Sequence, residues 1–442
     1  MKIPQTSPTL NQMIKELEGK DIMKIVSYAN NLPSKNYLHW DQFRFRPIPE
    51  GAELSKKQIW LGIKMHRRSN AKFLPLKDFS GSPFWLVRTD KVLSDLRQID
   101  LRAGGTIDTG DGDSSPELAR ERIRTSLIEE PFSSSVLEGA ATTRERAKEM
   151  IQQNIAPVTV DDKMVFNNYQ AMEFIKSNSD APLTPEIVLE THRIITEGTL
   201  DRPEMAGKLR DNDSVEVVDN YGEILHTPPK FVELQDRLKT ICDFANETEH
   251  DSQYFMHPIV RAIMLHFQLA YDHPFVDGNG RTARALFYWS VLRSGYWMFE
   301  YISISKVIKQ APAQYGRAFL HCETDENDAT YFVHHQLMVL LKSIAELEIY
   351  ISDKKAEFKA FSSLLKGHKF NHRQEFLLNQ FVRQKMAGIT IKEHEKLQGI
   401  SHLTARKDLE KLVDAKLLSK GLKNKSSYYK LRHRAIQRLK VE

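Results

Sequence analysis

Hydrophobic residues recur at helical spacing along most of the chain. Over residues 10–31 they stand mostly three or four positions apart, which predicts a helix. The same spacing around "KKQIWLGIKMH" predicts another helix, and beyond the loop "AGGTIDTGDGDSSPE" it continues to about Tyr350. We therefore expect a mostly α-helical fold, with an N-terminal helical region over residues 1–105 and a larger helical domain over residues 106–350.

One segment inside the larger domain departs from the helical pattern. In "SVEVVDNYGEILHTPPK" two short β-prone runs flank Asn220, Tyr221 and Gly222, which is typical of a β-hairpin, and Pro228–Pro229 ends the second run. An isolated hairpin is marginally stable in water unless it packs against another surface. The sequence therefore predicts a hairpin flap that covers a site in the helical domain.

The end of the chain has a different order of elements. "IKEHEKLQGISHLTARKDLEKLVDAKLLSKGLKNKSSYYKL" predicts a helix, a tight turn at Gly399–Ser401, a second helix, and two β-prone runs whose turn lies between Lys423 and Ser427. This order predicts a winged helix-turn-helix domain over residues 366–442. The alternative is a helical hairpin with a basic, solvated face.

Charge is unevenly divided between these parts. The 442 residues carry a formal net charge of +5, yet residues 366–442 alone contain 19 Lys and Arg against 7 Asp and Glu. The second helix of this domain presents His402, Arg406 and Lys407, which suit contacts to phosphate groups more than the reading of bases. We expect the domain to face DNA or a protein, while the rest of the chain is mildly acidic.

Composition narrows the class of protein further. With 41% hydrophobic residues, and no apolar run near the ~20 residues that span a bilayer, the chain is expected to be soluble and globular, without a membrane partner. The N-terminus "MKIPQTSPTLNQ" lacks the apolar segment of a signal peptide. The two cysteines, Cys242 and Cys322, have no ligand-like spacing, so we expect no disulfide scaffold and a cytoplasmic location.

The stretch "HPFVDGNGRTAR" is the densest cluster of chemically special residues. It stands between an apolar helical pattern, which Pro274 ends, and a second helical pattern that follows it. Gly278, Asn279 and Gly280 permit positive φ and add little bulk, so successive backbone N–H groups can converge on an anion. The following helix adds the positive end of its dipole. The pattern predicts a binding site for a phosphate chain.

Charged side chains around this loop indicate the chemistry. Arg281 and Arg284 lie three positions apart on one helix face, where both can reach an anion. Asp277 beside a polyphosphate is most simply a Mg²⁺ ligand, and His273 can serve as a general base. Together they indicate phosphoryl or nucleotidyl transfer to a hydroxyl. The alternative, a glycine-rich connector capped by its His and Asp, leaves the two arginines unexplained.

The same stretch resembles the Fic-family signature HxFx(D/E)GNGRxxR and matches each of its fixed positions. The resemblance implies transfer of AMP from ATP to a Ser, Thr or Tyr hydroxyl of a target protein. His273 would deprotonate the hydroxyl that attacks the α-phosphate, and Asp277 would hold Mg²⁺. The phosphates would be bound by Gly278, Asn279, Gly280 and Arg281, with Arg284 on the γ-phosphate and Phe275 anchoring the loop.

Two further residues have open roles under this resemblance. Thr282 would donate to a phosphate, or else face solvent on its helix. Tyr315, in "APAQYGRAF", would line the adenine pocket, or else belong to the core. His266, two helical turns before His273, is expected to be a core residue and not a metal ligand.

The resemblance extends over roughly residues 36–350. The predicted hairpin is similar to the flap with which Fic proteins hold an extended target segment. The tail resembles the winged-helix domain that follows the Fic core in many bacterial members.

A second motif of the same family precedes the core. "SSVLEG", from Ser134 to Gly139, matches the inhibitory signature (S/T)xxxE(G/N). The resemblance implies that Glu138 pairs with Arg284 and occupies the place of the γ-phosphate; otherwise Glu138 is a solvated helix residue.

We therefore expect a protein adenylyltransferase that is auto-inhibited by Glu138. Two alternatives remain: a DNA-binding regulator with a Fic-type nucleotide-sensing core, and a bifunctional enzyme that also removes AMP. The sequence leaves the oligomeric state open, a homodimer included.

Overall fold

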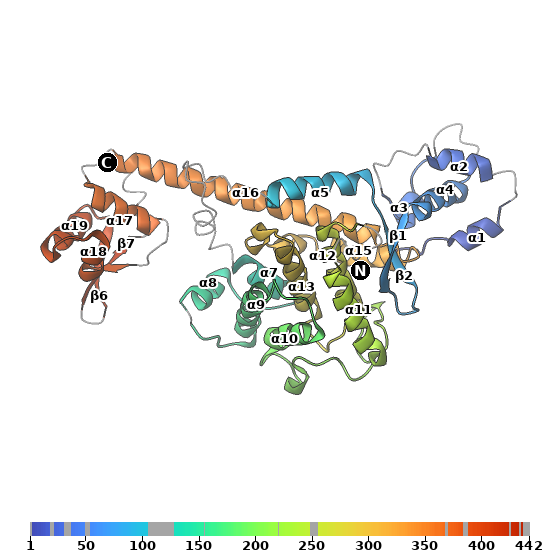
Figure 1. Ribbon diagram of the computed structural model, residues 1–442, viewed down its shortest axis with the longest axis horizontal. Helices are drawn as coiled ribbons and strands as arrows, with labels where there is room; N and C mark the ends of the chain where they lie inside the picture. The colour runs from blue at the N-terminus through green and yellow to red at the C-terminus, as the bar shows by residue number, and fades with distance from the viewer. Residues whose placement is uncertain are drawn as a thin grey trace. The chain divides into compact units, whose positions relative to one another are not determined.

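The structure is a computed structural model that describes residues 2–17, 22–30, 37–48, 54–104, 128–153, 155–219, 221–247, 255–366, 370–382, 388–423, 426–432 and 435 (Figure 1). Its contacts divide the chain into two compact units. The first contains the described residues up to Gly104 and from Ile128 to Glu346, and the second contains those from Leu347 onward. The predicted boundary at residues 105–106 lies outside the described residues.

The first unit begins with four helices: α1 (Leu10–Lys15), α2 (Ile22–Asn30), α3 (Trp40–Phe43) and α4 (Lys56–Ser69). Capping boxes start α1 and α4, with Thr9 and Ser55 as the N-caps. The single helix predicted over residues 10–31 is therefore two helices in the structure. Their apolar faces meet in one cluster around Trp60, which is fully buried.

A hairpin that the sequence pattern did not predict follows these helices. β1 (Ala71–Lys77) pairs with β2 (Pro83–Val87) in antiparallel register, and Gly81, at φ +84°, lies in the connecting turn. The helix α5 (Asp90–Ala103) comes next and starts at the N-cap Thr89. The N-terminal helical region thus also contains one short antiparallel hairpin.

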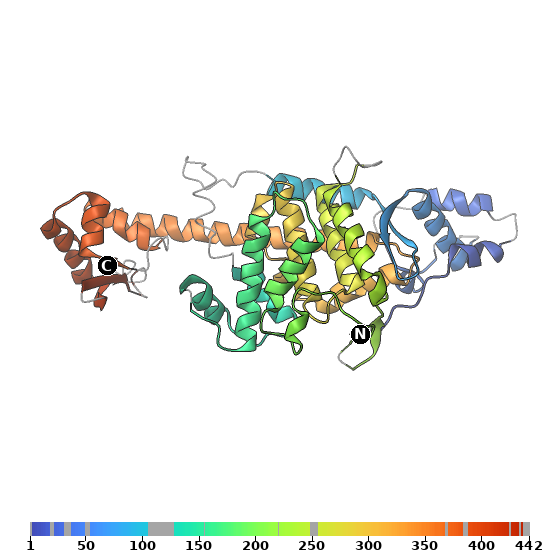
Figure 2. The ribbon, with the colours of Figure 1, turned by 60° about the horizontal axis from the view of Figure 1, so that its bottom comes forward.

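The core of the first unit is helical. Its helices are α7 (Glu129–Leu137), α8 (Arg144–Gln153), α9 (Val160–Ser177), α10 (Pro185–Thr196), α11 (Leu234–Asn246), α12 (Pro258–Asp272), α13 (Asn279–Arg293), α14 (Ile304–Ile308) and α15 (Pro312–Glu323), followed by the start of α16 (Thr330–Lys366). Figure 2 shows the green to yellow helices of this core side by side. α12 and α13 pack against each other and are buried on nearly every face, so they form the centre of the unit.

The predicted flap is present in this core. β3 (Val217–Val218) pairs with β4 (Ile224–His226) in antiparallel register. Asn220, in the connecting turn, lies outside the described residues, whereas its neighbour Tyr221 is 90% exposed. Short 3₁₀ helices stand before and after the flap, at Pro203–Met205 and Phe231–Glu233.

The second unit contains α17 (His372–Val382), β5 (Ile389–Thr390), α18 (Ile391–Gln398), α19 (His402–Asp414), β6 (Leu418–Lys423) and β7 (Ser426–Leu431). Its sheet is antiparallel with the order β5-β7-β6. Gly399, at φ +61°, ends α18, and Ser401 caps the start of α19. The two helices, their tight turn and the two strands that the tail sequence predicts are therefore present.

Both cysteines of the chain are buried. Cys242 and Cys322 are free thiols in the structure. Within the part of the chain that the structure describes, no helix has the length and apolar character needed to cross a membrane.

Candidate active site

The loop between α12 and α13 turns sharply. His273 ends α12 with φ +45° and ψ +56°, in the left-handed region, and Pro274 then prevents the helix from continuing. Gly278, at φ +79°, precedes α13, and a Cβ at this position would lie 2.7 Å from Cγ2 of Thr196. Only glycine therefore fits there. Asn279 and Gly280 are the first residues of α13, so positive φ is used at only one of the three predicted positions.

Two polar side chains hold the loop from inside. The amide of Asn279 donates to the Phe275 carbonyl oxygen at 2.8 Å and accepts from the Phe275 N–H at 2.9 Å. The buried Phe275 ring stacks on His192, with 3.7 Å between the ring centroids. Because its amide is used within the loop, Asn279 can contribute to a ligand only through its backbone.

His192, on α10, is a residue of the site that the sequence reasoning missed. Its Nδ1 accepts from the Gly207 N–H at 3.0 Å, so Nε2 carries the proton and donates to the Asp277 carbonyl oxygen at 2.9 Å. Burial lowers the pKa of His192 to about 4, which keeps the ring neutral. It therefore acts as a fixed support for the loop.

The His273 ring is oriented for proton abstraction. Nδ1 lies 3.1 Å from the Ala270 carbonyl oxygen, so Nδ1 carries the proton and Nε2 keeps its lone pair. Burial lowers the pKa of His273 below its ordinary value. A neutral ring with a free Nε2 at physiological pH is the form that a general base needs.

The N-terminus of α13 offers unpaired donors on one side of the loop. The Thr282 N–H is the first in α13 that bonds back, to the Gly278 carbonyl oxygen at 2.9 Å, so the preceding N–H groups have no acceptor within the helix. Arg281 is 1% exposed, yet its Nε and Nη1 have no partner in the structure, and neither has the Thr282 hydroxyl. Buried donors without acceptors are rare and costly, so these atoms indicate where ligand oxygens fit.

Asp277 stands at the open edge of this donor group. Its side chain is 59% exposed, accepts from the Gly278 N–H at 2.6 Å and pairs with Nη2 of Arg281 at 3.1 Å. Among the described residues, no group of three His, Cys, Asp or Glu side chains forms a metal site. A single exposed carboxylate does fit Mg²⁺, because that ion completes its shell with phosphate oxygens and water.

The predicted contact between Glu138 and Arg284 is present. Glu138 is the residue that ends α7, and its Oε1 accepts from Nη2 of Arg284 at 2.7 Å. Arg284 is buried and also donates from Nε to the Ser134 hydroxyl at 2.9 Å. A Cβ at Gly280 would clash with the Glu138 carboxylate, so this carboxylate lies directly against the start of α13. Burial opposes the charge of Arg284, but Glu138 raises its pKa above the ordinary value.

A second acid, which the sequence did not single out, fixes α7 in place. Glu130 is buried and accepts from the hydroxyls of Ser303 and Ser305, at 2.8 and 2.6 Å, and from the Ser305 N–H at 3.0 Å. Burial raises the pKa of Glu130. Because Glu130 stands eight positions before Glu138 at the other end of α7, its bonds hold the helix against α14.

Tyr315, on α15, lies beside the Glu138–Arg284 pair. Its hydroxyl bonds to Nε2 of His266 at 2.9 Å, and the charges of Arg284 and Glu138 both act on it. Burial raises the pKa of Tyr315 and lowers that of His266 to about 3. His266 is therefore a neutral core residue, as expected.

The flap is attached to the core through a buried histidine. Nδ1 of His226 lies 2.9 Å from Oε2 of Glu323, and its Nε2 lies 2.7 Å from the Tyr271 carbonyl oxygen. Since both ring nitrogens face acceptors, these contacts favour the doubly protonated form of the ring. Burial opposes this charge, but Glu323 raises the pKa of His226 above its ordinary value.

The part of the chain that contains this site is similar to a known protein family. The Fic/DOC family model matches residues 182–291, which include His192, the flap and the loop from His273 to Arg284. A crystal structure of a Fic family protein from Desulfovibrio desulfuricans G20 has a TM-score of 0.50 and 18% identity, covering 78% of this chain and 97% of that chain. At this identity the likeness concerns the fold alone.

The chain is also similar to named proteins over part of their length. The chain is similar to protein adenylyltransferase Fic of Nematostella vectensis, with 25% identity over 183 residues, or 40% of this chain and 40% of that protein. It is also 37% identical over 109 residues to protein adenylyltransferase fic-1 of Caenorhabditis elegans, which is 25% of this chain and 19% of that protein. The match thus spans less than half of the length of these curated relatives.

Proposed function

We propose that this protein transfers AMP from ATP to a Ser, Thr or Tyr hydroxyl of a target protein, and that Glu138 restrains the reaction. One observation carries the proposal: the neutral His273 ring, with Nε2 free, stands at the start of the loop, and the buried, unpartnered donors of Arg281 and Thr282 lie in the first turn of α13 directly after it. A base and an anion site at this spacing serve attack of a hydroxyl on a phosphate.

The reaction follows from these positions. Nε2 of His273 takes the hydroxyl proton while the hydroxyl oxygen forms a bond to the α-phosphorus of ATP. The bond from the α-phosphorus to the bridging oxygen breaks, and pyrophosphate leaves with that electron pair. The N–H groups at the start of α13 and the Arg281 guanidinium stabilise the negative charge on the phosphate oxygens. A Mg²⁺ ion held by Asp277 would neutralise part of the same charge.

Restraint by Glu138 follows from its contact with Arg284. A carboxylate and a phosphate compete for the same guanidinium fork, and Glu138 occupies it in this structure. We propose that the γ-phosphate reaches Arg284 only after Glu138 leaves, and that ATP otherwise binds in a non-productive pose.

Labelled ATP tests the reaction class. The protein carrying Glu138→Gly is incubated with ATP and Mg²⁺, with the radiolabel at the α-phosphate in one sample and at the γ-phosphate in the other. AMP transfer places label on protein only from the α-position. Label that arrives from the γ-position shows phosphorylation instead, and the proposal is then wrong.

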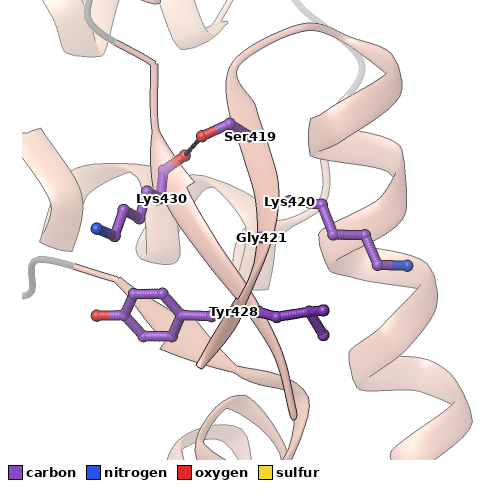
Figure 3. A pocket seen from close by; sticks show the side chains of 6 residues that line it. Ser419, Lys420, Gly421, Tyr428 and Lys430 are labelled. Carbon is purple, nitrogen blue, oxygen red and sulfur yellow. Dashed lines mark hydrogen bonds between the residues drawn. The ribbon is translucent and has the colours of Figure 1, made fainter. Parts of the chain in front are cut away.

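For the second unit we propose a winged helix-turn-helix domain that contacts DNA. Its support is the exposed pair Arg406–Lys407 on α19 and the basic β6–β7 hairpin, where Lys420 and Lys430 point to opposite sides (Figure 3). A shallow hollow of about 270 Å³ on this hairpin is lined by Ser419, Lys420, Gly421, Leu422, Tyr428 and Lys430.

Salt dependence tests the DNA proposal. Phosphate contacts release counterions, so affinity for duplex DNA should fall steeply as salt rises, and Lys407→Ala should reduce that slope by about one unit. If the domain does not bind duplex DNA at low salt, or binds it with an affinity that salt does not change, the DNA proposal is wrong and a protein partner is favoured.

A further inference from the structure

The segment that leads into the flap contains one deeply buried arginine. Arg210 lies between the 3₁₀ helix Pro203–Met205 and β3, and its side chain is 1% exposed. A guanidinium has five N–H donors in a rigid fork and is almost never buried unless those donors are satisfied. The acceptors of Arg210 therefore show what the residue holds together.

These acceptors come from both ends of the flap and from the catalytic loop. Nη1 donates to the Asn212 carbonyl oxygen at 2.7 Å and to Oδ1 of Asp213 at 2.9 Å, both on the chain that enters the flap. Nη2 donates to the Pro229 carbonyl oxygen, on the chain that leaves it. Nε donates to the carbonyl oxygen of His273 at 3.1 Å. The backbone N–H of Arg210 adds a bond to the Pro274 carbonyl oxygen at 2.9 Å.

The His273 backbone needs such support. Its left-handed conformation, at φ +45°, is unfavourable for a residue with a side chain, and it persists only where the surroundings enforce it. The Leu269 and Ala270 carbonyl oxygens hold the N–H and the ring of His273 from the side of α12. Arg210 holds its carbonyl oxygen from the side of the flap.

We infer that Arg210 is a positioning residue that fixes the flap and the general base His273 to each other. A target hydroxyl presented by the flap then meets Nε2 of His273 at a constant distance, whatever segment carries the hydroxyl. This inference rests on the proposed function, and it adds a residue outside the signature loop to the reaction.

Arg210 also acts on His273 through its positive charge. Burial lowers the pKa of His273, and the positive charges of His226 and Arg210 lower it further, while Glu138 opposes them. Replacing Arg210 by a neutral residue should therefore raise the pKa of His273 as well as release its carbonyl oxygen. A side chain that merely filled space would change neither property.

The test compares three variants in the full chain, all carrying Glu138→Gly. Arg210→Met keeps the length of the side chain and removes every donor, whereas Arg210→Lys keeps the charge but not the fork. Arg202→Met is the matched control, because Arg202 precedes the same flap but lies at the surface, paired with Glu204 and Asp211. The rate of self-modification, the affinity for ATP and the pH profile of the rate are measured for each folded protein.

We expect Arg210→Met to lower kcat by about 10–100-fold, since a small misplacement of reacting groups costs this much. The acid limb of its pH–rate profile should move to higher pH, and its ATP affinity should stay within about twofold of the parent value. The kcat of Arg210→Lys should lie between the values of Arg210→Met and Arg202→Met. A kcat equal to that of Arg202→Met overturns the inference, as does an ATP affinity that falls in step with kcat. If Arg210→Met does not fold, Arg210→Lys decides by the same comparison.

A separate measurement distinguishes failure of the inference from failure of the proposed function. If the parent protein transfers no AMP, the proposed function is wrong, and the His273 ring is then followed by NMR of histidine-labelled protein. A changed pKa or proton position on the ring in Arg210→Met supports the positioning role. An unchanged ring overturns it.

Discussion

Removal of the Glu138 carboxylate should activate the protein. In Glu138→Gly, Arg284 keeps its bonds to the hydroxyl and the carbonyl oxygen of Ser134 but loses the carboxylate that Nη2 contacts, so the γ-phosphate no longer competes with Glu138 for this guanidinium. His273 and the start of α13 make no hydrogen bond to Glu138, so they should stay in place.

The size of the effect follows from the geometry of the pair. A hydrogen bond to a charged group contributes about 1.5–3 kcal/mol. Because the Glu138 side chain is 33% exposed, the lower end of this range applies, and about 1.4 kcal/mol corresponds to a factor of ten. We expect AMP transfer by Glu138→Gly to be about tenfold faster than by the wild type at sub-saturating ATP. Since Glu138 ends α7 and does not lie inside it, the glycine should cost less than about 1 kcal/mol of helix stability.

Time courses of intact mass at several ATP concentrations measure this gain. Glu138→Gln is the matched control, because a neutral amide of the same shape still fills the space and should activate less. Adding Arg284→Ala to Glu138→Gly should cancel the gain, since the freed guanidinium is then absent. A folded Glu138→Gly protein that works no faster than wild type would show that the Glu138–Arg284 pair does not restrain the reaction.

Other parts of the site give further expectations. His273→Ala should lower transfer by about 10²–10⁴-fold while ATP binding by calorimetry stays unchanged, and near-wild-type turnover would exclude His273 as the base. Asp277→Ala should raise the Mg²⁺ concentration needed for half-maximal rate, whereas identical metal titrations would place the ion elsewhere. Because burial lowers the pKa of His273 below its usual 6.5, kcat/KM should stay constant as pH falls to that value and decline only below it; a decline centred at 6.5 or higher would contradict the burial argument. Deleting the chain from about Lys366 should leave self-modification intact, because the candidate site lies in the first unit, and loss of ATP binding would contradict that separation.

Local patterns predicted the parts of this structure that depend on neighbours in sequence. The end of α12, the helix that follows the loop, the flap and the tight turn at Gly399–Ser401 follow from apolar periodicity, from Pro274 and from glycine positions. The β1–β2 hairpin did not follow from such a pattern. β2 has buried residues at four successive positions, so it lacks the alternation that marks a half-exposed strand.

Residues that act across the fold were harder to predict. His192 and Arg210 support the loop from positions more than 60 residues away in sequence, and nothing in their own surroundings indicates that contact. Glu130 likewise reaches Ser303 and Ser305 only after folding. The pairing of Glu138 with Arg284 came from a family resemblance and not from spacing, because 146 positions separate the two residues.

The most direct test of the central claim is the intact mass of two proteins after incubation with ATP and Mg²⁺. The first carries Glu138→Gly, and the second carries Glu138→Gly together with His273→Ala. We predict that the first gains the mass of AMP, on itself or on an added target, and that the second gains none although both bind ATP. Equal gain in both proteins, or no gain in the first, would contradict the account of His273 as the base of an adenylyltransferase.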